Sequence, residues 1–176
     1  MKLIAAVLLT LASCQQVPAQ TLDANGWTVL TPSADSRMIY VSSSGGNDAN
    51  NGLSEATPKK TIKQASSMLR NGYPDWLLLK SGDTFTEGTL SISRGGRSAT
   101  EPLVISSYGI GSRPILSETS FQYWGPNLPA GYSMNFVTST NLDFRGNYAA
   151  NSADINLRAI LLKGAMRNIT IEGNSF

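Results

Sequence analysis

Short runs of alternating apolar and polar residues constrain the fold of this sequence more than any other feature. The last such run, Asn168–Glu172, alternates isoleucine with polar residues, the period-two pattern of a strand with one buried face. Similar runs recur from Trp76 onward and are separated by Gly, Asn, Asp and Pro, which are typical of turns. The sequence therefore predicts an all-β chain of many short strands.

A single short helix is predicted before these strands, at about residues 61–70. Pro58 lies just upstream, Ile62, Ala65 and Leu69 fall on one helical face, and Asn71-Gly72 is a stop signal. The chain has 176 residues, of which 41% are hydrophobic, enough for one core and one domain.

Composition excludes several classes of function. The 14 Lys and Arg residues nearly balance the 12 Asp and Glu residues, and no basic run is present, so we expect no nucleic-acid partner. Histidine is absent, which excludes Ser-His-Asp and Cys-His mechanisms and His-ligated metal sites within this chain. No feature points to an obligate protein partner.

Residues 1–19 have the pattern of an export signal, with a basic Lys2 followed by a short apolar run. Two processing sites compete. Val17-Pro18-Ala19 suits a signal peptidase that would leave Gln20 as the new N-terminus, whereas Leu11–Cys14 resembles a bacterial lipobox in which Cys14 is acylated. We expect an exported protein, either periplasmic, extracellular or attached to the outer membrane through a lipid on Cys14.

Residues 20–38 are predicted to form a polar lead-in that packs an aromatic side chain, from Trp27, against the domain. Beyond it, two segments repeat. "NLDFRGN" at Asn141–Asn147 and "NITIEGN" at Asn168–Asn174 share their pattern at an offset of 27 residues, 141 to 168. A strand–turn unit stacked on its own copy is typical of a coil of a parallel β-helix.

This repeat makes a specific prediction about register. Leu142 should lie directly under Ile169, with Phe144 under Ile171 and both pairs facing inward. Asn147 and Asn174 should then be in contact at the turn.

The segment "IYVSSSGGNDANNGLSEATPKKTIKQASSML" resembles the opening of bacterial secreted right-handed parallel β-helix repeat proteins of the pectin-lyase-like superfamily. "LLLKSGDTF" and "GGRSATEPLVISSYGIGSRPIL" resemble their following strands and turns. The resemblance implies a right-handed parallel β-helix over residues 39–176 with a short N-terminal capping α-helix. It also implies that this chain is only the N-terminal part of a longer solenoid.

The same resemblance implies activity on polysaccharides along an exposed groove. Lyases of this kind use a Lys or Arg base, often with Ca²⁺ bound by Asp, Glu or Asn. The outward residues of the repeat, Asp143, Arg145 and Glu172, are the candidate catalytic residues. The 27-residue offset would place Arg145 beside Glu172, so an exposed cross-strand ion pair is the simpler interpretation.

Two loops offer further candidates. Asp48 and Asn50 lie in a D-x-N-x-G spacing that resembles the start of a Ca²⁺ loop, although Glu55 is too near to complete an EF-hand and an Asx-rich turn explains the pattern as well.

A second loop region is rich in Gly, Pro and aromatic residues. Tyr123, Trp124 and Tyr132 are its candidate substrate-binding side chains, since flat rings stack on sugars; the same rings could equally hold the loop against the domain.

From these observations we expect an exported, carbohydrate-active β-helix protein that is a polysaccharide lyase or glycoside hydrolase in its full-length form. The alternative is a non-catalytic cell-surface protein that binds glycans or acts as an adhesin or spacer. The sequence alone assigns no catalytic base and no substrate beyond a polysaccharide.

Overall fold

The computed structural model describes residues 21–24, 26–117, 120–124, 134–140, 142–145, 160–163 and 166–175. The predicted export signal with Cys14, the predicted loop residue Tyr132 and the repeat residue Asn147 lie outside the described residues. Within the described part, short strands predominate and only one α-helix is present.

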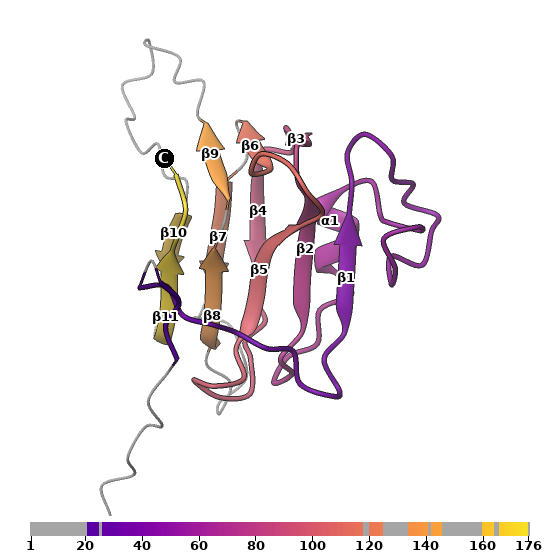
Figure 1. Cartoon of the computed structure of the whole chain (residues 1–176). Coiled ribbons are helices and arrows are strands. Elements are labelled where there is room, and N and C mark those ends of the chain that lie inside the picture. The colour runs from indigo at the N-terminus through magenta and orange to yellow at the C-terminus, as the bar shows by residue number, and fades with distance from the viewer. Residues whose placement is uncertain are drawn as a thin grey trace, which may run out of the picture.

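The strands form three sheets (Figure 1). The largest sheet contains, in spatial order, β1 (Met38–Val41), β2 (Trp76–Lys80), β5 (Leu103–Tyr108), β8 (Met134–Thr140) and β11 (Met166–Glu172). The second sheet contains β4 (Thr89–Ile92), β7 (Ser120–Trp124) and β10 (Ile160–Lys163). The third contains β3 (Thr84–Phe85), β6 (Ile115–Ser117) and β9 (Asp143–Arg145).

All pairings between these strands are parallel. From β2 onward the chain visits the largest sheet, the third sheet and the second sheet in turn and then repeats this order. From β2 onward, neighbours in each sheet are therefore separated in sequence by two strands of the other sheets, whereas only α1 lies between β1 and β2. The expectation of an all-β chain is confirmed, but the described sheets are not closed into a solenoid.

Rows of apolar side chains across paired strands form the core. In the largest sheet, Ile39 pairs with Leu77 and Leu77 with Ile105, and all three are fully buried. Leu90 and Ile92 of β4 and Leu116 of β6 are buried in the same cluster. Alternation along the strands places these residues on one face, and side chains from all three sheets contribute to one apolar core.

The helix α1 is shorter than the expected 61–70 and spans Ile62–Ser66. Its apolar face is buried as the sequence pattern indicates, since Ile62, Ala65 and Leu69 join the core cluster. The helix packs against β1, β2 and β4, and Figure 1 shows it behind the β1 end of the largest sheet. It thus covers the apolar interior at that end of the strand stack.

The register predicted from the 27-residue repeat is wrong. Ile169 pairs with Val137 and Ile171 with Ser139, whereas Phe144 pairs with Leu116 in another sheet. The two matching segments are therefore strands of different sheets. Their shared pattern encodes a strand followed by a turn, and the chain uses such a unit more than once before it returns to the same sheet.

The Asn174 side chain hydrogen-bonds two backbone groups at this turn. Its side-chain oxygen accepts a hydrogen bond from the Leu142 N–H (3.0 Å), and its amide nitrogen donates to the Ser139 carbonyl (2.8 Å). The asparagine therefore satisfies backbone groups in the chain segment between β8 and β9.

The lead-in crosses the face of the largest sheet from β11 toward β1 (Figure 1). Polar contacts hold it, including a hydrogen bond from Ser33 Oγ to Glu101 (2.6 Å) and an ion pair between Asp35 and Arg97. Trp27 does not pack closely against the domain as expected, because 42% of its surface is exposed. Hydrogen bonds rather than aromatic burial therefore attach this segment.

Candidate functional site

The Asp48–Asn50 loop is built as a structural turn. Asp48 Oδ1 accepts hydrogen bonds from the Lys60 and Thr61 N–H groups (both 2.9 Å), and Oδ2 accepts one from Thr61 Oγ1 (3.0 Å). The Asn50 side chain donates to the Pro58 carbonyl (2.9 Å). These bonds tie the loop to the chain that leads into α1, which is the role of an Asx-rich turn.

Glu172, at the end of β11, fastens the lead-in. Its carboxylate accepts hydrogen bonds from the Thr28 N–H (2.9 Å) and the Thr28 hydroxyl (3.2 Å). In the sheet Glu172 is paired with Thr140. Arg145 is paired with Ser117 in the third sheet, so the expected neighbour relation between Arg145 and Glu172 is absent from the strand register.

The remaining sequence candidates are placed by their backbone alone. Asp143 opens β9 opposite Ile115. Tyr123 of β7 is paired with Ile92, which is buried, and Trp124 is paired with Lys163 of β10. Tyr123 therefore occupies a register position in line with a core residue, while Trp124 occupies the next position along the strand.

Two buried carboxylates that the sequence did not single out as functional anchor neighbouring strands. Asp83 accepts hydrogen bonds from Ser42 Oγ (2.8 Å) and Ser44 Oγ (2.7 Å), which follow β1. Burial raises the pKa of Asp83, but the hydrogen bonds from Ser44 and Ser42 outweigh it, so the pKa lies below its ordinary value. Gly82 precedes it with φ of 83°, a turn conformation that suits glycine.

Asp75 is the more deeply buried of the two carboxylates, with none of its side chain exposed. It forms an ion pair with Arg70 and accepts hydrogen bonds from the Arg37 N–H (2.9 Å) and the Arg70 N–H (2.9 Å). Burial opposes ionisation, yet the Arg70 side chain and these backbone donors lower the pKa of Asp75. The cluster joins the lead-in, the chain after α1 and the start of β2.

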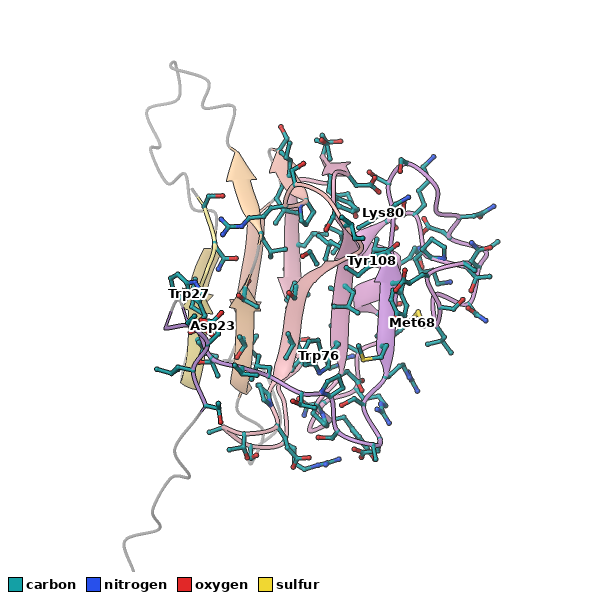
Figure 2. All side chains as sticks on the ribbon, viewed as in Figure 1. Asp23, Trp27, Met68, Trp76, Lys80 and Tyr108 are labelled. Carbon is teal, nitrogen blue, oxygen red and sulfur yellow. The ribbon has the colours of Figure 1, made fainter. Side chains whose placement is uncertain are left out.

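Tyr108, near Lys80 in Figure 2, lies at the end of β5. Burial, followed by the negative charge of Asp83, raises the pKa of Tyr108 to about 12. Its ring contacts Tyr40 edge to face at 5.0 Å. The tyrosine is therefore neutral at physiological pH and acts through packing.

A groove of about 470 Å³ lies between α1 and β4. Its lining comprises Lys63, Ser66, Ser67, Glu87, Leu90, Ser91, Ile92, Ser93 and Arg94. Seven of these nine side chains are polar or charged. A wall of hydroxyl, ammonium and guanidinium groups can hydrogen-bond a polar ligand, and the volume is in the range of small-molecule sites.

Among the described residues, no three or more Asp, Glu, His or Cys side chains gather in a way that could hold a metal ion. The part of the chain that the structure describes also contains no helix long and apolar enough to cross a membrane.

The chain was compared with known proteins. No protein-family profile matches it. A curated lacto-N-biosidase from Bifidobacterium longum subsp. longum is 34% identical over 85 residues, which are 48% of this chain and 5% of that enzyme. The chain thus spans a small part of the relative it matches.

The solved structures that resemble this chain are also structures of a lacto-N-biosidase. The selenomethionine derivative of a GH136 lacto-N-biosidase from Eubacterium ramulus superposes with a TM-score of 0.52 and 22% identity, covering 78% of this chain and 28% of that one. The native form of that enzyme gives a TM-score of 0.49 at the same identity and coverage. At this identity the likeness is one of fold.

These findings correct the family expectation. The similar proteins are lacto-N-biosidases and the described sheets are not closed into a solenoid, so the assignment to the pectin-lyase-like superfamily is wrong. The residues that suggested it, such as Asp48 and the Gly82-Asp83 turn, form turns and anchors. Parallel strands joined by tight turns need such residues whatever the family.

Proposed function

We propose that this chain is part of a carbohydrate-active enzyme that hydrolyses a glycosidic bond in a glycan. The observation that carries the proposal is the 34% identity to a lacto-N-biosidase, which the fold likeness to a second lacto-N-biosidase supports. Hydrolysis is preferred to elimination because both similar proteins bear the name of a glycosidase. A lacto-N-bioside is accordingly the first substrate to test.

Glycosidases of most families require two carboxyl groups, one as acid and one as base or nucleophile. Asp143 and Glu172 remain the proposed carboxylates of this chain, and Arg145 a proposed substrate contact. Glu172 is already engaged by Thr28, so a catalytic role would require that it also face the substrate. Tyr123, Trp124 and Tyr132 remain proposed sugar-stacking residues.

Trp27 is a further aromatic for sugar contact. The backbone N–H of Trp27 donates to Asp23 Oδ1 (2.9 Å), and the backbone N–H of Asp23 donates to the Trp27 carbonyl (2.8 Å). A tight turn therefore holds the tryptophan backbone in place. Figure 2 shows Asp23 and Trp27 on the β11 side of the molecule. A half-exposed tryptophan on a fixed turn favours glycan binding, with or without catalysis.

For the fold we propose that the three sheets are the walls of a right-handed β-helical coil. The repeated order in which the chain visits the sheets supports this arrangement. Connections between adjacent parallel strands of one sheet are right-handed in nearly all proteins, which supports the hand. Helix α1 would then cap the first coil.

We also propose that the protein is exported, with residues 1–19 as its signal and Cys14 as an alternative acylation site. Replacement of Cys14 by alanine should move an acylated protein from the membrane to the soluble fraction. A soluble product that begins at Gln20 in the unmodified chain would refute acylation.

The test of the proposed function is incubation of the whole protein with an aryl lacto-N-bioside and, separately, with a uronate polysaccharide. Hydrolysis releases the aryl group from the first substrate. An unsaturated sugar from the second would identify a lyase and refute the proposal, and binding without turnover of either would identify a glycan-binding protein. D143N and E172Q test the proposed carboxylates, since loss of a required carboxyl group should abolish turnover.

A further inference from the structure

The groove between α1 and β4 contains two cationic side chains that have no acidic partner among the residues that the structure describes. The ion pairs of the described residues involve Arg70 and Arg97. Among the described residues, the side chain of Lys63 on α1 makes no hydrogen bond. The guanidinium of Arg94, just after β4, donates only to Ser93 Oγ (3.1 Å). Most of the N–H donors of the Arg94 guanidinium are therefore unused.

Glu87, on the same groove wall, is committed to the start of the helix. Its two oxygens accept hydrogen bonds from the Ile62 N–H (2.7 Å) and the Lys63 N–H (3.0 Å). Its charge therefore serves the unsatisfied N–H groups of α1. With one carboxylate against two cations, the lining carries a net positive charge.

Serine hydroxyls complete the polar lining. The Ser66 and Ser67 hydroxyls donate to the carbonyls of Lys63 and Gln64 (3.0 and 2.6 Å), which leaves their lone pairs to accept. Ser91 is exposed on β4, between the buried Leu90 and Ile92. Acceptors, a free hydroxyl and two cations together match a ligand that has hydroxyl groups and a negative charge.

We propose that this groove binds a sugar unit that carries an anionic group, either a carboxylate or a sulfate ester. Arg94 and Lys63 bind the anion, and the serines bind the ring hydroxyls. This inference rests on the proposed function, because it assigns an anionic group to the glycan on which the protein is proposed to act. A carboxylate and a sulfate ester both present anionic oxygens that can accept hydrogen bonds from a guanidinium group. Because the groove chemistry fits both anions, the experiment compares a probe that carries each of them.

The experiment titrates the full chain with three oligosaccharides of equal length, observed by backbone amide NMR. One contains uronic acid, one carries sulfate esters and one is neutral. An acidic probe should shift the amides of Ser91, Ser93 and Arg94, and should bind about tenfold more tightly than the neutral probe. Added salt should weaken the binding, because charge pairing drives it.

Two variants test the cations. R94Q and K63Q should each weaken binding of the acidic probe about threefold, which together account for the tenfold preference, and should leave binding of the neutral probe unchanged. The control is K60Q, which removes the same charge from an exposed lysine that does not line the groove and should leave both affinities unchanged. Amide spectra of the unbound variants establish that each remains folded.

Equal affinity for acidic and neutral probes, or unchanged binding in R94Q, would overturn the proposal and leave glycan hydrolysis standing. A protein that binds the acidic probe through Arg94 but hydrolyses no glycan would support the groove assignment while the proposed function fails. The relative affinity of the uronate and sulfate probes identifies which anion the groove prefers.

Discussion

At the scale of single residues, four carboxylates hold separate parts of the chain together. Asp48, Asp75, Asp83 and Glu172 each accept hydrogen bonds from residues distant in sequence. The sequence flagged Asp48 and Glu172 as chemical candidates because acidic residues in turns and on outward positions are also what ligand sites contain. The hydrogen-bond partners of Asp48 and Glu172 lie between 12 and 144 residues away, and local patterns do not contain these partners.

Replacement of Asp75 by asparagine should destabilise the fold by about 3 kcal/mol, because Arg70 would lose its buried anionic partner. The measurement is the free energy of unfolding in urea. D35N is the matched control, since Asp35 is exposed and its solvent-screened ion pair with Arg97 should contribute much less to stability. Equal losses in the two variants would show that burial does not control the cost.

Acid should destabilise the protein through Asp75 and Asp83. Both pKa values are lowered on folding, so the stabilisation is present above the ordinary value of 3.8 and is lost as the pH falls through the lower, folded pKa values. Unfolding free energies measured from neutral pH downward should decline in that window. D75N and D83N should each flatten the decline, and an unchanged slope in both would contradict the assignment.

At the scale of elements, the strands and the helix were predictable but their partners were not. Alternation of apolar and polar residues located strands such as β4 and β11, and the stripe of Ile62, Ala65 and Leu69 located α1. The repeat of "NLDF" and "NITI" nonetheless gave the wrong register, because the two similar segments are strands of different sheets. The partner of a strand depends on how much chain lies between the two strands. The pattern of residues within a strand does not give that length.

The lead-in should detach from β11 when Glu172 is replaced by alanine. Thr28 would lose the acceptor for its N–H and its hydroxyl. Hydrogen exchange measured by mass spectrometry should become faster over residues 21–30 and stay unchanged at β2. E172Q keeps one side-chain oxygen as acceptor and should retain part of the protection; full protection in E172A would show that other contacts hold the segment.

At the scale of the whole molecule, the parallel three-sheet architecture agrees with a fold shared by a lacto-N-biosidase. Composition excluded histidine-dependent chemistry and pointed toward an all-β chain, whereas the expectation of a glycan-active protein came from the resemblance to secreted β-helix proteins. The family was assigned wrongly, because the quoted motifs describe turns and a helix start that unrelated parallel β folds require. The α1–β4 groove also escaped prediction, since its lining comes from two segments whose contact only the fold creates.

The most direct test of glycosidic hydrolysis is digestion of a lacto-N-bioside-containing glycan by the whole protein in heavy-oxygen water, with the products analysed by mass spectrometry. A hydrolase must transfer one solvent oxygen to the new reducing end of the released sugar, and this is the predicted result. Cleavage without solvent oxygen, accompanied by an unsaturated sugar, would contradict the account, as would an intact glycan that the protein binds but does not cleave.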